Sequence, residues 1–598
     1  MKQTTLVNML LIFAAVIGAL FLSSGTAAAQ TSTNLNPPPY NPYPPGILPP
    51  NLNSEIARVR QEVGIVEHEA LAQWKTLPPP TLTGQPPTLQ GTGMKANQLL
   101  GKLMNFDENM SPLRDRACGF CHMPYAGFSG PIQSVNLTMV AYPGSYQYRA
   151  GKRTAQRYTY APNFPVLNYN AAQGAFLGGN FWDSRATGYL LGSPDAEQAQ
   201  HPPVDTQEHM LPDTACIAYR ISQAEYYPLY TTVWGPFSIA FPENTEQICS
   251  IPGGASVFNG NATPINLSPQ DRAIANNVYD HWGNSLDQYE ASQDVGAFSS
   301  KFDAYVAYLT SPTGKTNPFT SDEIAGYNLF RGKANCNSCH LDGNGTSATS
   351  SPTAPPAATA PLFTCFGSAN LGLPLNPRDA FYYQTTPDIF GFTANPYGFG
   401  YRDLGLGTFL RSGFGAAPSP NSSWTQYAPT SDGQMQTSSA RNVAMVPAKC
   451  GSTEAPGPYF QKEFFHNGYI KSLKQLVHFY NTRDVPAYKF NVTSGHCPPG
   501  TVEKVTCWPE PEVTNNLDMT IGDLDLTDHE EDQVVAFLQT LTDGYSTPYP
   551  DSNVFLGACS TGGTAATQGN ETIIPTPPLP PCAAAVCDVS PRPSPPIP

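Results

Sequence analysis

Two short motifs combine cysteine and histidine at a spacing that has a specific chemistry. Residues 118–122 read Cys-Gly-Phe-Cys-His, and residues 336–340 read Cys-Asn-Ser-Cys-His. Two thiols one helical turn apart can add to the two vinyl groups of one haem, and the adjacent histidine can then ligate the iron. The motifs therefore predict two covalently bound c-type haems, held by Cys118, Cys121, His122, Cys336, Cys339 and His340.

Two other uses of such cysteine pairs match the sequence less well. A zinc ribbon needs its cysteine pairs close together in sequence, whereas these pairs lie in different halves of the chain. A redox-active dithiol leaves the adjacent histidine unexplained. We therefore interpret both motifs as haem attachment sites.

The overall composition excludes some classes of function. The 598-residue chain has a net charge of −15 and 13% charged residues, against roughly 25% in an average globular protein. No basic surplus exists to neutralise phosphates, which argues against a nucleic-acid partner. The hydrophobic content of 40% is sufficient for packed cores.

The first 29 residues have the pattern of a secretory signal peptide. Lys2 precedes an apolar run over residues 6–22, and small residues at 27–29 form a cleavage site. An uncleaved anchor helix is the alternative. No other stretch is long and apolar enough to span a membrane, so we expect an exported or periplasmic chain that is not an integral membrane protein.

Helical periodicity and proline content divide the rest of the chain. We expect a Pro-rich linker with one helix over 30–91, a globular part over 92–545 divided near 310, and a loosely draped Pro-rich tail over 546–598. The helical windows are 53–77, 274–293, 299–310, 321–332, 471–481 and 527–542.

Further motifs surround the two haem motifs in a fixed order. Residues 165–168 read Pro-Val-Leu-Asn, 181–186 read Phe-Trp-Asp-Ser-Arg-Ala, 440–444 read Ala-Arg-Asn-Val-Ala and 465–468 read Phe-His-Asn-Gly. With them the chain resembles the bacterial di-haem cytochrome c peroxidase/MauG superfamily from about 98 to 543. The resemblance implies a mostly α fold. Two cytochrome c-like haem domains with long loops, over 92–310 and 311–545, would be flanked by the Pro-rich extensions.

The resemblance also assigns roles around the first haem. Glu208 matches the distal acid–base carboxylate, Gln198 a distal hydrogen-bonding residue, and Trp182 the tryptophan between the two haems. Taken without the resemblance, Glu208 is better interpreted as a solvated loop carboxylate, and Trp182 as a large core side chain. The loop between Trp182 and Gln198 is longer than in the family.

Two features of the first haem region depart from the family or stay open. No histidine occurs between His122 and His201, where many family members have a distal ligand, so we expect the first iron to have an open position. Tyr146 or Tyr148 could occupy this region, and His201 or His209 could still swing in. Asn168 matches a residue that helps to hold calcium, an ion that needs six to eight oxygen ligands.

The second haem is expected to differ from that of typical peroxidases. The family position of its other axial ligand falls on Tyr480, and a tyrosine oxygen stabilises oxidised iron whereas a thioether raises the potential. The alternative is that Tyr480 is a core aromatic and that Met435 or Met445 reaches the iron. Ala334 stands where MauG has a tryptophan before its second motif.

These residues support one leading function and two alternatives. The leading hypothesis is that the chain reduces hydrogen peroxide with electrons from a small redox protein. The first alternative is a MauG-like di-haem oxidase or oxygenase that acts on an unknown substrate. The second alternative is an electron-transfer cytochrome without turnover of its own.

The cysteines outside the haem motifs number nine. In an oxidising compartment they could form up to four disulfides and leave one thiol over. Cys497 with Cys507 and Cys582 with Cys587 are the nearest pairs in sequence, but spacing does not fix the connectivity.

Overall fold

Short helices joined by long loops form most of this chain, and its strands are few and short. The computed structural model describes residues 41–76, 94–253, 264–342, 360–412, 424–454, 458–549, 551 and 553–561. The predicted signal peptide, the Ser/Thr-rich stretch after residue 342, and Cys582 and Cys587 lie outside these ranges. The described residues from Pro42 onward pack as one compact unit.

The helices are α2 (Leu52–Thr76), α3 (Ala96–Asn105), α4 (Cys118–Cys121), α5 (Gln133–Leu137), α6 (Pro194–Ala199), α7 (Ala215–Ile221), α8 (Tyr227–Trp234), α9 (Thr245–Cys249), α10 (Pro269–Glu290), α11 (Lys301–Thr310), α12 (Ser321–Arg331), α13 (Leu406–Arg411), α14 (Leu473–Thr482) and α15 (Asp528–Gln539). Each window predicted to be helical overlaps a helix of the structure. These helices are α2, α10, α11, α12, α14 and α15. Side-chain oxygens of Ser300, Thr320 and Thr527 cap α11, α12 and α15.

Within the described ranges, the strands form three antiparallel pairs. They are β1 (Asn168–Asn170) with β2 (Ala175–Leu177), β3 (Ser368–Ala369) with β4 (Met435–Gln436), and β5 (Pro458–Tyr459) with β6 (Ser560–Thr561). The described part of the chain is therefore mostly helical, as predicted.

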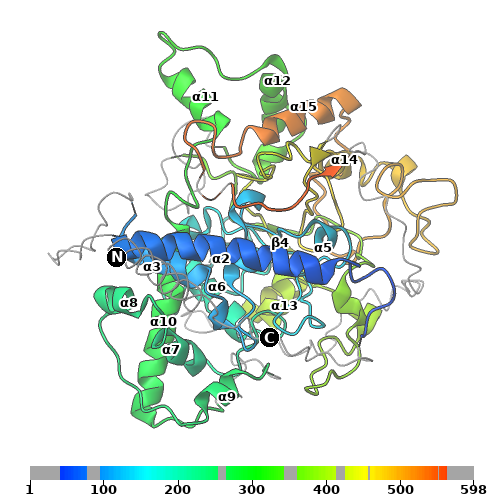
Figure 1. Cartoon of the computed structure of the whole chain (residues 1–598). Helices are drawn as coiled ribbons and strands as arrows, with labels where there is room; N and C mark the ends of the chain where they lie inside the picture. Colours follow the sequence, from blue (N-terminus) through cyan, green and yellow to red (C-terminus); the bar gives the residue numbers. More distant parts are fainter. Residues whose placement is uncertain are drawn as a thin grey trace, which may run out of the picture. The chain divides into compact units, whose positions relative to one another are not determined.

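The two haem motifs are each preceded by a helix that crosses a later helix through a glycine. α3 packs on α10, and a Cβ at Gly101 would overlap the carbonyl oxygen of Ser285. α12 packs on α15, and a Cβ at Gly326 would overlap the carbonyl oxygen of Gln533. Figure 1 shows both helix pairs side by side. Glycine at each crossing lets the two backbones approach closely enough to frame the motif that follows.

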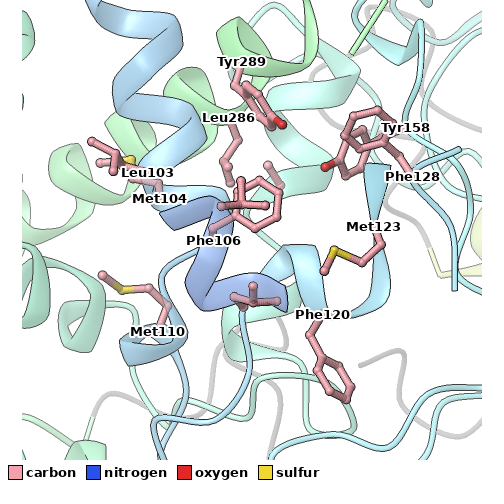
Figure 2. Packing of buried hydrophobic residues seen from close by; sticks show 14 of the residues in the cluster. Leu103, Met104, Phe106, Met110, Phe120, Met123, Phe128, Tyr158, Leu286 and Tyr289 are labelled. Carbon is pink, nitrogen blue, oxygen red and sulfur yellow. The ribbon is translucent and has the colours of Figure 1, made fainter. Parts of the chain in front are cut away.

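Two large hydrophobic cores lie next to the two motifs. The first joins the N-terminal helices to α10, and Figure 2 shows Phe106 at the end of α3 beside Leu286 and Tyr289 of α10. A Cβ at Gly119, inside the first motif, would overlap the Phe106 ring. The second core runs from Phe302 to Leu541. The predicted domain boundary near 310 stays a prediction.

The predicted linker helix is an integral part of the first core. Val59, Val63 and Val66 on one face of α2 are fully buried, and α2 lies beside α3 (Figure 1). Glu62 on the same helix accepts a hydrogen bond from the Tyr125 hydroxyl at 2.6 Å. Helix α2 therefore supports the first motif, which is a larger role than a spacer.

The beginning of the predicted tail is also packed, which corrects one expectation. Tyr549, Val554 and Phe555 are buried in the first core, and Leu556 N–H donates to Glu62 at 2.8 Å. A disulfide between Cys450 and Cys559 fixes this segment. Proline, serine and threonine dominate the composition after residue 546, but the three large apolar side chains of Tyr549, Val554 and Phe555 anchor the start of this segment in the first core.

Two further disulfides join Cys216 with Cys249 and Cys497 with Cys507. Cys365 is the thiol outside the haem motifs that stays unpaired among the described residues. Within the described ranges, no helix is long and apolar enough to cross a membrane.

Candidate functional site

The first motif presents two thiols and an oriented imidazole to a cavity. Cys118, Cys121 and His122 line a space of about 1320 Å³, which includes its open mouth. The Nδ1 atom of His122 lies 3.0 Å from the carbonyl oxygen of Phe128. When Nδ1 carries the proton and donates it to this carbonyl, Nε2 is left as the nitrogen that can ligate a metal.

The second motif repeats this arrangement in a second cavity. Cys336, Cys339 and His340 line a space of about 1800 Å³, again including its mouth. The Nδ1 atom of His340 lies 2.9 Å from the carbonyl oxygen of Phe363. Both histidines are thus oriented by a carbonyl that comes after the motif in sequence.

The residues of both motifs fit a covalently attached haem. The four motif cysteines carry free thiols, while the other described cysteines except Cys365 are paired. Burial lowers the pKa of His122 to about 4, which keeps the imidazole in the neutral form that binds iron.

Glu208 and Gln198 line the same cavity as the first motif. Gln198 lies on α6, which is capped by Ser193, whose hydroxyl accepts hydrogen bonds from Asp195 N–H and Ala196 N–H. Glu208 follows a short turn, and its carbonyl accepts a hydrogen bond from Ser145 N–H at 2.9 Å. The structure therefore brings these two predicted residues to the first haem site.

The environment of Glu208 perturbs its carboxyl group. The Glu208 side chain lines the first cavity and is exposed within it. Desolvation by the surrounding protein is the largest cause that raises the pKa of Glu208 to about 8. The negative charge of Asp205 raises the pKa further, and the Arg185 guanidinium opposes both effects. A carboxyl group of this kind can exist in both protonation states near neutral pH.

Trp182 lies in the wall between the two cavities. It lines both of them, together with Thr154, Ala155, Gln156 and Arg157. Its indole Nε1 donates to the carbonyl oxygen of Thr154 at 3.2 Å, and its own carbonyl accepts from Gln436 N–H at 2.8 Å. Trp182 therefore lies between the two cavities, and its role between two haems stays a prediction.

Ion pairs and an unusual backbone hold the loop that carries Trp182. Phe181 and Ser184 have φ values of 72° and 58°, a left-handed conformation that non-glycine residues adopt at a cost. Asp183 pairs with Arg153 at 2.8 Å, and Arg153 also pairs with Asp403 at 2.7 Å. This network links the loop to the segment before α13.

The residues that line the first cavity indicate which side chains could ligate its iron from the distal side. Of the described residues, Tyr146, Tyr148 and His201 are not among those that line this cavity, whereas His209 is. The Nδ1 atom of His209 lies 3.1 Å from the carbonyl oxygen of Met110. An open position on the first iron stays a prediction. Of His201 and His209, the two histidines that could ligate this iron from the distal side, His209 lines the cavity.

Tyr480 and Met435 both line the second cavity, and Met445 is not among its lining residues in the described chain. Tyr480 lies on α14 beside Phe465, with ring centroids 5.8 Å apart. Burial raises the pKa of its phenol. The choice of axial ligand between Tyr480 and Met435 is thus open at the second haem.

Asn168 lies on β1 and not in either cavity. Its side-chain amide donates to the carbonyls of Val166 and Leu177 at 3.0 and 3.3 Å. The described residues contain no group of three or more His, Cys, Asp or Glu side chains that could hold a metal. The calcium ion predicted at Asn168 therefore stays a prediction.

Several residues around the cavities were not predicted. Asp205 precedes Glu208 by three residues, and that spacing alone is the only sequence signal for it. Arg157 and Lys462 line the second cavity, but nothing in their local sequence distinguishes them from surface cations.

Comparison with known proteins places this arrangement in context. Residues 95–310 match the family model described as di-haem cytochrome c peroxidase. The methylamine utilization protein MauG of Paracoccus denitrificans is 26% identical over 448 residues, which cover 74% of this chain and 88% of that protein. The chain is thus similar to the di-haem cytochrome c peroxidase/MauG superfamily. This similarity implies two c-type haems, in agreement with the two cavities.

Solved structures show which fold this chain shares. The dihaem peroxidase BthA from Burkholderia thailandensis is similar with a TM-score of 0.51 and 22% identity, over 78% of this chain and 90% of that chain. A tyrosine-to-methionine variant of BthA has the same TM-score and identity, over 81% of this chain and 100% of that chain. The chain therefore has a dihaem peroxidase-like fold.

Proposed function

We propose that this chain is an exported di-haem c-type cytochrome that reduces hydrogen peroxide with electrons from a small redox protein. One observation supports it most: Glu208, whose pKa is about 8, lines the first cavity with Gln198 and His122. Trp182 separates this cavity from the second motif.

The overall reaction sets the tasks of the protein. Hydrogen peroxide takes up two electrons and two protons and gives two molecules of water. The haem at the first cavity supplies an iron that binds and reduces peroxide. The chain must therefore move protons at the peroxide oxygens and deliver electrons to this site.

Glu208 is the group that moves the protons in this proposal. The carboxylate takes a proton from one peroxide oxygen and, as carboxylic acid, returns it to the oxygen that leaves as water. A pKa near the working pH suits both steps, because neither form of the carboxyl group is scarce. Gln198 orients the peroxide through its amide hydrogen bonds.

Electrons reach the first cavity from the second, past Trp182. The two motifs differ in exposure: Gly119 and Phe120 of the first are buried, whereas Ser338 of the second is exposed. A redox protein can therefore approach the second attachment site more closely. Trp182 lines both cavities, so its indole provides an aromatic connection between them.

A di-haem oxidase related to MauG is the second candidate. Its supporting observation is Tyr480 in the second cavity, because an oxygen ligand would stabilise oxidised iron and hinder reduction by a donor. Ala334 stands before the second motif and is 3% exposed. It offers no aromatic ring to a docked substrate protein.

The test is steady-state oxidation of a reduced small c-type cytochrome by hydrogen peroxide, with the haem-loaded protein as catalyst. We expect turnover by the wild type, and a loss of 10²–10⁴-fold in kcat for Glu208→Gln, typical of removing a general acid–base group. Glu225→Gln is the matched control, since Glu225 forms an exposed ion pair with Lys75. No donor oxidation by a protein that consumes peroxide would favour the oxidase. No reaction with peroxide would favour the electron-transfer cytochrome.

A further inference from the structure

The second cavity contains two cations in its wall, Arg157 and Lys462. Lys462 is 2% exposed, and its Nζ donates to the carbonyls of Ala126 and Met445 at 2.9 and 2.8 Å. Arg157 donates one bond to the carbonyl of Ser439 at 3.2 Å. Both side chains therefore contact neutral carbonyl groups.

No carboxylate neutralises either cation among the residues that the structure describes. Two fully buried arginines, by contrast, have one: Arg149 pairs with Asp388 at 2.6 Å, and Arg441 pairs with Asp303 at 2.8 Å. The Nε atom of Arg157 is buried and has no hydrogen-bond partner. A buried donor without a partner is costly, and an unpaired buried charge more so.

The charge of Arg157 also acts on Lys462. Burial lowers the pKa of Arg157 to about 10. For Lys462, burial and then the charge of Arg157 lower the pKa. Two like charges in a water-poor wall are unfavourable unless an anion lies between or beside them.

Glu463 does not serve as this anion, although it follows Lys462 in sequence and lines the same cavity. Its nearest ion-pair partner is Lys471, with Oε2 and Nζ 3.7 Å apart. Burial raises the pKa of Glu463 to about 8, so much of this group is uncharged at neutral pH.

We propose that Arg157 and Lys462 bind the propionate carboxylates of the second haem. The haem attached at Cys336 and Cys339 would fill the cavity that both cations line, and it carries two carboxylates. The Arg157 Nε–H would then gain its missing acceptor. Because Arg157 also lines the first cavity, it is a positioning residue at the wall between the haems. The proposal rests on haem attachment and not on peroxide turnover.

The test is a potentiometric titration of the haems in the holoprotein, with resonance Raman spectra of the propionate bending vibrations. The variants are Arg157→Gln, Arg157→Lys and Lys462→Gln, each first shown to hold two haems. Lys333→Gln is the control, because Lys333 is 38% exposed, pairs with Glu530 and lies just before the second motif.

We expect each glutamine variant to lower the midpoint potential of the second haem and to shift its propionate vibration, because an unneutralised carboxylate stabilises ferric iron. Arg157→Lys should restore most of the potential, and Lys333→Gln should leave the vibration unchanged. A potential shift in the control Lys333→Gln that equals the shifts in Arg157→Gln and Lys462→Gln would overturn the proposal. Unchanged propionate vibrations in both Arg157→Gln and Lys462→Gln would also overturn it. A wild-type vibration that responds to added acetate would identify a solution anion instead.

Discussion

The indole Nε1 of Trp182 lies 3.2 Å from the carbonyl oxygen of Thr154, and both residues line both cavities. This hydrogen bond fixes the ring in the wall that separates the two haem attachment motifs. The arrangement gives the two sites a shared aromatic group, which is what a division of labour between electron uptake and peroxide chemistry needs.

Replacement of Trp182 by phenylalanine tests this shared wall. Trp182→Phe keeps an aromatic ring but loses the hydrogen bond, at a cost of about 1 kcal/mol in the free energy of unfolding. Phenylalanine is much harder to oxidise than an indole. We expect slower reoxidation of the second haem by peroxide, measured by stopped-flow absorbance.

The matched control is Trp234→Phe, which loses a comparable hydrogen bond from Nε1 to Ser285 Oγ at 2.9 Å. Trp234 is not among the described residues that line either cavity. An equal rate in Trp182→Phe and Trp234→Phe would remove Trp182 from the electron path.

The pKa of Glu208 can be shifted through its neighbour Asp205. Glu208 acts first as a base in the proposed reaction, so kcat/KM should rise with pH through about 8, the pKa of this group. Asp205→Asn removes a negative charge that raises this pKa and keeps an oxygen to accept the Gln207 N–H bond, 2.7 Å long in the wild type. The rise should therefore move to lower pH.

The measurement is the pH–rate profile of peroxide-dependent donor oxidation for the wild type and Asp205→Asn. A rise displaced to higher pH, or one that persists in Glu208→Gln, would mean that another group sets the profile.

Local patterns predicted much of this molecule. The thiol and imidazole spacing identified both attachment motifs, and apolar periodicity located α2, α10, α12 and α14 within a few residues. Such signals depend on residues one helical turn apart, which is why a single sequence carries them. The motif order around residues 181–186 placed Trp182, Gln198 and Glu208 at the cavities.

Long-range packing was not predictable from the same sequence. Phe555 packs on Tyr125 with ring centroids 4.9 Å apart, yet it lies in a segment whose composition indicates a loose tail. Arg157 and Lys462 resemble surface cations until the fold places them in one cavity. Partners hundreds of residues apart leave no local pattern, so these features needed the three-dimensional structure.

The visible spectrum of the second haem tests Tyr480. If the phenol oxygen ligates the iron, Tyr480→Phe should change the absorption and electron spin resonance spectra of that haem and raise its potential. The first haem should be unaffected and serves as an internal control. Unchanged spectra would exclude ligation, and Met435→Leu is then the variant expected to change them.

The disulfide between Cys450 and Cys559 should stabilise the packed tail segment. It joins residues 109 apart in sequence, and closing a loop of about 100 residues contributes up to ~4.7 kcal/mol. We expect Cys450→Ala with Cys559→Ala to lower the free energy of unfolding by about 2–5 kcal/mol in guanidinium denaturation.

The control is the pair Cys497→Ala with Cys507→Ala, which opens a sequence separation of 10. The shorter loop should cost less, roughly 3 kcal/mol on the same entropic argument. A larger loss from this pair would show that loop entropy does not dominate.

The most direct test of the proposed peroxidase function measures how many electrons each peroxide molecule takes from the donor. Known amounts of hydrogen peroxide are added anaerobically to the holoprotein with an excess of reduced small cytochrome, and the oxidised donor is measured. We expect the wild type to oxidise two donor molecules per peroxide. Glu208→Gln should keep this ratio of donor to peroxide at a rate 10²–10⁴-fold lower. Peroxide consumption without donor oxidation, or an unchanged rate in Glu208→Gln, would contradict it.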